Sequence, residues 1–166
     1  MTLKQRWPVL VSASIFISAI MVGWFFHPFE IDPPKIPEHP PFLPIALQNL
    51  LIIFFLGVGG LLLGVPTVLV GAWNAFLAGA IFAAVTDEPA WWLALSIHGM
   101  PELAGQFCAM VSGLKIAATL IRKITHDTPL RLTSPLRWFG LALGLTLIAV
   151  VLECTVSAIV AKAVIR

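Results

Sequence analysis

The chain has 166 residues, of which 59% are hydrophobic and only 11% are charged, and its mean hydropathy is +0.98. Soluble domains carry about 25% charged residues, so this composition excludes a globular cytoplasmic enzyme and predicts an integral membrane protein. Ten Lys and Arg with a formal net charge of +2 offer no basic surface that could follow phosphates, which excludes a nucleic-acid-binding protein.

The first apolar segment follows Lys4 and Arg6 and covers residues 7–26, about the length that crosses a bilayer. A basic start before an apolar stretch is also typical of a secretory signal peptide. No small-residue cleavage site follows this one. We therefore expect an uncleaved first membrane helix.

A proline-rich segment comes next, at residues 28–44, where seven positions are proline. Proline fixes φ and lacks a backbone N–H, so this segment is expected to be an extended loop. The apolar block behind it is interrupted near Pro66 and is too long for a single crossing. It predicts two spans, residues 45–63 and 66–85, joined by a tight turn.

The following apolar run, residues 90–121, contains Gly99 and Pro101. Residues 101–121 alone are long enough to cross the bilayer. Pro101 is then expected in the first turn of that span, where proline is tolerated. The preceding residues, 90–98, are expected to form a short interfacial or re-entrant helix.

A basic loop at residues 122–137 precedes the last predicted span, residues 138–162. The expected fold class is therefore all-α: one polytopic membrane domain, residues 1–166, with about five transmembrane helices. The positive-inside rule places the N-terminus and the basic loop in the cytoplasm, and the proline-rich loop outside. Five spans would leave the C-terminus outside, although Lys162 and Arg166 favour the inner side.

The few polar residues inside the predicted spans gather at one depth. Counting along the spans places five of them toward the outer side of the bilayer: Gln48, Asn49, His98, Glu102 and Glu153. Asn74 is expected near the midplane. A carboxylate at such a depth costs about 3 kcal/mol unless it is protonated, paired or hydrated. The sequence therefore predicts a polar cluster built from segments that are far apart in the chain.

Each of these residues also has a purely structural interpretation. Glu102 would suit the N-terminal end of a helix and could accept a hydrogen bond from His98. Asn74 would suit an interhelical hydrogen bond, and Glu153 would suit a hydrogen-bonded carboxylic acid in the core. These alternatives stay open at this point.

Glycine spacing predicts close helix packing. Gly60 and Gly64 form one GxxxG pair, and Gly140 and Gly144 form another in the last span. This spacing lets two helix backbones approach each other closely. It predicts tight packing within the chain or a homodimer.

The polar residues stand in an order that resembles a known family. Gln48-Asn49 opens a glycine-rich helix, Asn74 lies in GAWNAFLAGAIF, the run His98-Gly99-Met100-Pro101-Glu102 holds a His-Gly-x-x-Glu motif, and Glu153 ends LIAVVLE. This order resembles that of the stage II sporulation protein M family. In that family an Asn-Asn pair, an Asn-Gly pair, a Pro-His-Gly-x-x-Glu motif and a final Glu follow one another in the same order. The resemblance covers roughly residues 45–165.

The resemblance implies an integral membrane protein without established catalytic chemistry, in a bacterial or archaeal cytoplasmic membrane. The founding member of the family is similar to a membrane anchor for cell-wall hydrolases, and related members accompany circular-bacteriocin maturation and export. A cell-wall hydrolase or an export complex is therefore the kind of partner that it implies, and no cofactor is expected.

Three functional hypotheses follow. The first is a non-enzymatic scaffold or accessory subunit, homodimeric, in an envelope-remodelling or export machine. The second is a small ion- or proton-coupled transporter or channel that uses His98, Glu102 and Glu153, since a broken helix beside such residues is typical of transporters. The third is an intramembrane metal site or enzyme. Only one His and two Glu are available as metal ligands for it, and no nucleophile lies beside them in the sequence.

Overall fold

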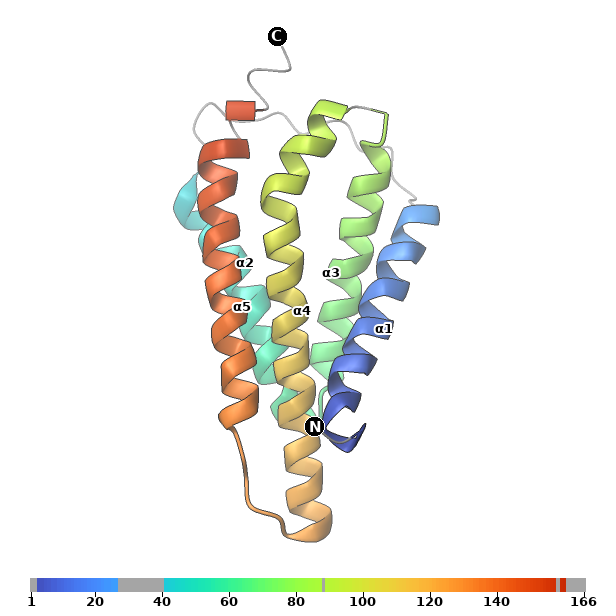
Figure 1. Ribbon diagram of the computed structural model, residues 1–166, viewed down its shortest axis with the longest axis vertical. Helices are drawn as coiled ribbons and strands as arrows, with labels where there is room; N and C mark the ends of the chain where they lie inside the picture. The colour runs from blue at the N-terminus through green and yellow to red at the C-terminus, as the bar shows by residue number, and fades with distance from the viewer. Residues whose placement is uncertain (1–2, 27–40, 88, 158, 161–166) are drawn as a thin grey trace.

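This computed structural model describes residues 3–26, 41–87, 89–157 and 159–160, and these residues form a bundle of five long helices with no strand among them (Figure 1). The helices are α1 (Leu3–Phe25), α2 (Phe42–Val58), α3 (Val65–Ala84), α4 (Pro89–His126) and α5 (Thr133–Leu152). All five are long and apolar enough to cross a bilayer. The predicted all-α membrane fold with five transmembrane helices is therefore confirmed.

Two of the sequence predictions fall largely on parts of the chain outside the described residues. Most of the proline-rich loop expected at residues 28–44 lies there, and so does the end of the last span beyond residue 160. The final three residues of that loop are helical, because α2 begins at Phe42. Pro44 then lies in the first turn of α2, where its missing N–H costs no helical hydrogen bond.

The chain reverses between α2 and α3 in a tight turn. A short 3-10 helix, η1 (Gly59–Leu62), extends α2, and the next two residues, Leu63 and Gly64, both have positive φ, 55° and 83°. The N–H of Gly64 donates to the carbonyl of Gly59 at 3.2 Å, which closes the turn. Pro66 then lies in the first turn of α3.

The structure corrects the expectation of a separate short helix at residues 90–98. That segment is instead the first part of α4, which continues through Gly99 and Pro101 to His126. A proline inside a membrane helix removes one backbone hydrogen bond, and neighbouring helices can compensate for that loss. Packing holds the segment in place, since Trp91 and Ala94 are buried.

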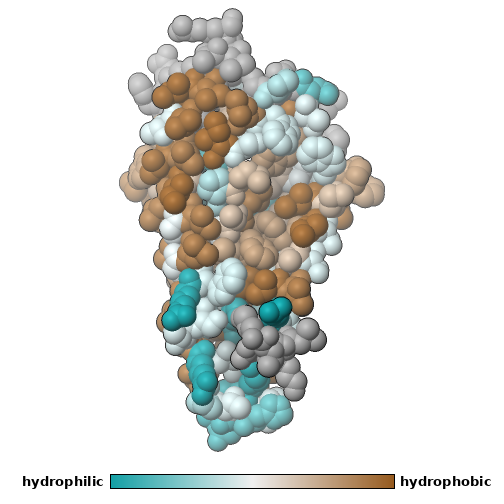
Figure 2. All heavy atoms as spheres, in the orientation of Figure 1, coloured by the Kyte–Doolittle hydropathy of each residue, from teal (hydrophilic) through white to brown (hydrophobic). Residues whose placement is uncertain are grey.

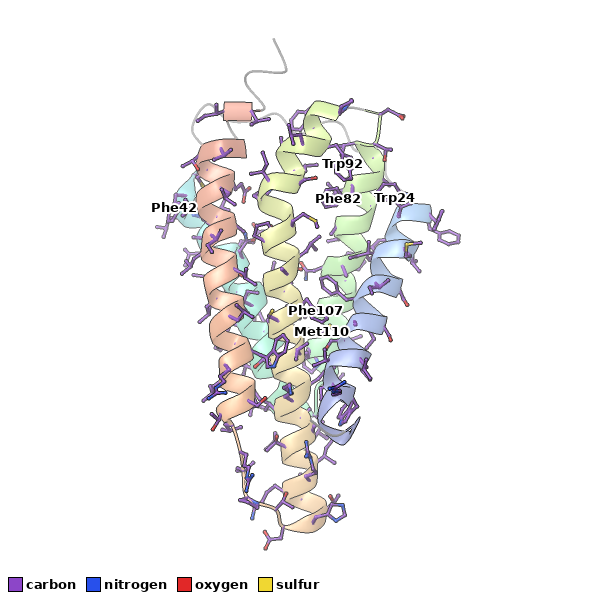
Figure 3. All side chains as sticks on the ribbon, viewed as in Figure 1. Trp24, Phe42, Phe82, Trp92, Phe107 and Met110 are labelled. Carbon is purple, nitrogen blue, oxygen red and sulfur yellow. The ribbon has the colours of Figure 1, made fainter. Side chains whose placement is uncertain are left out.

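Aromatic side chains join the outer part of α4 to its neighbours. The rings of Phe82 and Trp92 meet edge to face, with centroids 5.8 Å apart. Trp24 of α1, Phe82 of α3 and Trp92 of α4 lie near the same end of the bundle in Figure 3. The segment before Pro101 is thus packed against α3 and does not lie apart on the membrane surface.

Helix α4 is the central helix of the bundle. It contacts all four other helices. In its apolar segment 67% of the residues are buried, against 22–39% in the apolar segments of the other four helices. At 38 residues it is about 57 Å long, well beyond the hydrocarbon thickness of about 30 Å. Its last turns therefore extend past the ends of its neighbours, as Figure 1 shows at the lower end.

Glycines set the closest helix approaches. A Cβ at Gly79 of α3 would lie 2.1 Å from the carbonyl oxygen of Ile20 in α1. A Cβ at Gly113 of α4 would lie 2.2 Å from the carbonyl oxygen of Leu56 in α2. Gly60 of the first GxxxG pair packs on Gly113 in the same way, so this pair serves packing within the chain.

Apolar side chains cover most of the outer surface. Figure 2 shows a broad hydrophobic region over the middle and upper part of the molecule, and hydrophilic residues gather at the lower end. Many large side chains are more than half exposed, among them Leu69 at 65% and Leu136 at 61%. Such a surface fits the hydrocarbon of a bilayer.

The glycine contact at α4 predicts a specific stability effect. Gly113→Ala should lower the free energy of unfolding in detergent by about 1–3 kcal/mol, because the new methyl group would collide with backbone atoms of Leu56. Gly140→Ala is the matched control, since nothing lies within 4 Å of a Cβ at Gly140. It should not lower the free energy of unfolding of the protomer, because alanine favours a helix more than glycine does. Equal thermal or denaturant stability of the two variants would contradict the close contact.

Candidate functional site

The predicted polar residues line a cavity between α2, α3 and α4. Its volume is about 240 Å³, and it lies toward the end of the bundle where α2 and α4 begin. Its polar lining residues are Gln48 and Asn49 from α2, Asn74 from α3, and His98, Glu102 and Gln106 from α4. We call this cavity the polar pocket.

Helical geometry explains why one helix supplies so much of the lining. His98, Glu102 and Gln106 are spaced four residues apart, so they lie on one face of α4. Gly99, on the same side, leaves room where a larger residue would fill the pocket. The break expected at Pro101 would have disrupted this row, whereas the continuous helix keeps it intact.

Glu102 has a hydrogen-bond partner within the pocket. The side-chain nitrogen Nε2 of Gln106 donates to Oε1 of Glu102 at 3.0 Å. The side-chain oxygen of Gln106 is buried and has no hydrogen-bond partner among the described residues. A bound donor, such as water or a protonated group, would satisfy that oxygen.

The side chains of two other lining residues form hydrogen bonds with backbone carbonyls of their own helices. The amide nitrogen of Asn74 donates to the carbonyl of Val70 at 2.9 Å. Nδ1 of His98 lies 3.1 Å from the carbonyl of Ala94, and since a carbonyl only accepts, Nδ1 must carry the proton in this bond. This hydrogen bond of Asn74 thus lies within α3 and does not cross to another helix.

The two polar lining residues of α2, Gln48 and Asn49, differ in exposure. Asn49 is 8% exposed, whereas Gln48 is exposed at the pocket rim. The structure therefore brings Gln48, Asn49, Asn74, His98, Gly99 and Glu102 to one pocket. Asn74, expected deeper, belongs to the same cavity as the rest.

Glu153 and Pro101 do not line the pocket. Glu153 begins η2 (Glu153–Ser157), a π-helical turn that contacts α4. Its carboxyl group is close enough to that of Glu102 for their charges to interact. π-Helical turns are frequent at functional sites. Because Glu153 contributes no lining but belongs to a turn that contacts α4, it is a neighbour of the pocket.

Sequence reasoning missed one member of the site, Gln106. The four-residue spacing from Glu102 was visible in the sequence and points to the same face of α4. The span predicted at residues 101–121 already contains both residues, so this spacing alone could have identified Gln106.

The pocket can bind small polar species but offers few metal ligands. Within the described ranges, no three His, Cys, Asp or Glu residues lie together as a metal site requires. The lining presents one carboxyl group and five amide or imidazole side chains, and one of these, Gln106, has the unpartnered oxygen. This set suits a water molecule, a proton or a weakly held cation, and the described lining contains no Ser, Thr or Cys.

Comparison with known proteins gives one match. The sequence profile of the family described as stage II sporulation protein M matches residues 12–158. No curated protein and no solved structure matches the chain significantly. The matched residues include all of the polar pocket.

The contact between Glu102 and Gln106 can be measured by a double-mutant cycle. Glu102→Met and Gln106→Met each remove one partner, and the two changes together should destabilise the protein less than their sum. We expect a coupling of about 1 kcal/mol in the free energy of unfolding, the range for hydrogen bonds in membrane helices. Gln48→Met, at the exposed rim, should couple to neither. Additive effects would show that the bond contributes nothing to stability.

Proposed function

The chain belongs to the stage II sporulation protein M family, and on this premise we propose that it is a non-enzymatic scaffold or accessory subunit of an envelope-remodelling or export machine. The observation that carries the proposal is the buried apolar core that lies below the polar pocket. The pocket lies toward the end of the bundle where α2 and α4 begin, and fully buried apolar side chains follow it along both helices.

Fully buried apolar side chains lie below the pocket in the described part of the bundle. Ala109, Met110 and Val111 of α4 are 0% exposed, and Leu56 of α2 is also 0% exposed. Figure 3 places Phe107 and Met110 in the middle of the bundle. Such a core suits a rigid support, because it holds α2 and α4 together through fully buried apolar side chains.

Partners of the scaffold would bind its outer surfaces. We propose two: a second copy of the chain, and a cell-wall hydrolase or export complex, as the family resemblance implies. Support for the second copy comes from Gly140 and Gly144 on α5. Both are exposed and have open space at the Cβ position, so this GxxxG pair is available to another helix.

The proposed orientation follows the positive-inside rule in a bacterial or archaeal cytoplasmic membrane. Arg122, Lys123, Arg131 and Arg137 lie at the same end of the bundle as the start of α1. This end would face the cytoplasm. The polar pocket would then lie toward the outer side, where an envelope enzyme would act.

A second candidate function is proton- or cation-coupled transport. The specific observation is the half-buried Glu102, with Gln106 bonded to it and Glu153 nearby. Buried carboxyl groups within membrane helices are typical of proton and ion pathways. This candidate requires the apolar core to open in another conformation.

The dimer interface can be tested on α5. Changing both Gly140 and Gly144 to Ile should weaken the dimer about tenfold, because the side chains would hold two helix backbones apart. The monomer fraction would be measured by single-molecule photobleaching in liposomes. Leu69→Ile, on the exposed face of α3, is the control and should leave the dimer unchanged. A monomeric wild-type protein would rule out the homodimer.

A flux assay separates the two functions. In proteoliposomes with a proton, Na⁺ or K⁺ gradient, the scaffold proposal expects no flux above protein-free vesicles. Glu102→Gln should fold with little change in its unfolding midpoint, because the amide is isosteric with the carboxyl group and keeps an acceptor oxygen for Gln106. Flux in the wild type that Glu102→Gln abolishes, with the midpoint unchanged, would overturn the scaffold proposal in favour of transport.

A further inference from the structure

A second cavity lies at the opposite end of α4. Its volume is about 330 Å³, and it is enclosed by the lower part of α4, the start of α1 and the start of α5. Three of its lining residues are basic: Lys115, Arg122 and Arg131. We call this cavity the basic pocket, and it shares no residue with the polar pocket.

The positive charges of the basic pocket have no acidic partner in the described structure. Its lining contains no Asp or Glu. Asp127, the nearest acid in the sequence, pairs with Lys123, and this is the one ion pair among the described residues. Lys115 is only 8% exposed, and a buried ammonium group is costly without an anion beside it.

The pocket also offers donors in suitable positions. Arg122 uses only its Nε–H within the described chain, donating to the carbonyl of Ala118 at 3.1 Å, so its terminal nitrogens keep their donors. The hydroxyl of Ser134 lines the pocket in the first turn of α5. That turn also presents the positive end of the helix dipole.

The surroundings of the pocket are those of a membrane boundary. Pro8 of α1 and Pro135 of α5 line it, and the residues next to them, Trp7 and Leu136, are exposed at 38% and 61%. An anion seated among the basic groups would therefore lie beside surface that fits acyl chains. Basic pockets between membrane helices are suited to the headgroups of acidic lipids.

We propose that Lys115, Arg122 and Arg131 form a binding site for a phosphate anion, carried by the headgroup of an acidic glycerophospholipid. The phosphate accepts charge-assisted hydrogen bonds from the ammonium and guanidinium groups. The acyl chains extend along the apolar faces of α1 and α5. The site binds lipid independently of the polar pocket and of either proposed function.

The test uses the full chain in neutral detergent. Phosphatidylglycerol is added in parallel with phosphatidylcholine of the same acyl chains, and bound lipid is counted by native mass spectrometry while the unfolding midpoint is recorded. The wild type should retain phosphatidylglycerol in preference to phosphatidylcholine. The double variant Arg122→Gln/Arg131→Gln should bind phosphatidylglycerol about thirtyfold more weakly, as expected for the loss of two basic groups from an anionic lipid site.

Two further variants separate the pocket from general surface charge. Lys123→Gln/Arg137→Gln removes two charges at the same end but outside the pocket and should keep the preference for phosphatidylglycerol. Lys115→Met keeps a long apolar side chain, so it should fold with an unchanged midpoint in phosphatidylcholine but lose the stabilisation by phosphatidylglycerol. Equal binding of the two lipids by the wild type, or equal losses in the two double variants, would overturn the proposal.

Inorganic phosphate distinguishes the source of the anion. A lipid site should show little stabilisation by millimolar phosphate and strong stabilisation by phosphatidylglycerol. If inorganic phosphate stabilised the wild type as well as phosphatidylglycerol does, and displaced it, the acidic lipid would be overturned as the natural occupant.

Discussion

Hydrocarbon offers no hydrogen-bond partner, so each polar group within a membrane helix must find its partner inside the protein. In this chain the constraint falls mainly on α4, which carries His98, Glu102, Gln106 and Lys115 and is the most buried of the five helices. The other helices pack around it with apolar outer faces. The position of α4 at the centre of the bundle thus follows from where the polar residues lie in the sequence.

Close packing around α4 depends on residues without side chains. Gly113 lets the backbone of α2 approach α4, and Thr67 of α3 donates to the carbonyl of Leu56 at the same place, at 2.8 Å. Gly79 and Gly23 serve the α1–α3 contact in the same way. Without a hydrophobic driving force between helices in lipid, such close contacts supply much of the packing energy.

The polar groups of α4 divide into two separate sites. The polar pocket presents one carboxyl group with amide and imidazole side chains, and the basic pocket presents three cations. Buried apolar residues such as Met110 and Val111 lie between them on the same helix. The protein therefore presents different chemistry at its two ends, which fits a component that meets different partners on the two sides of a membrane.

The sequence by itself determined the membrane environment, the five helices and most members of the polar pocket, because hydropathy, length and the cost of buried charge are local properties of the chain. It failed at Pro101, since proline usually ends a helix in water, whereas the burial of Trp91 and Ala94 within the bundle depends on tertiary packing. Gln106 was missed although its four-residue spacing from Glu102 is a local signal. Only the tertiary structure decided that Asn74 joins the polar pocket while Glu153 lies outside its lining, and that Lys115 and Arg131 line one cavity. Those neighbours are set by how helices pack in three dimensions, and no spacing along one helix encodes them.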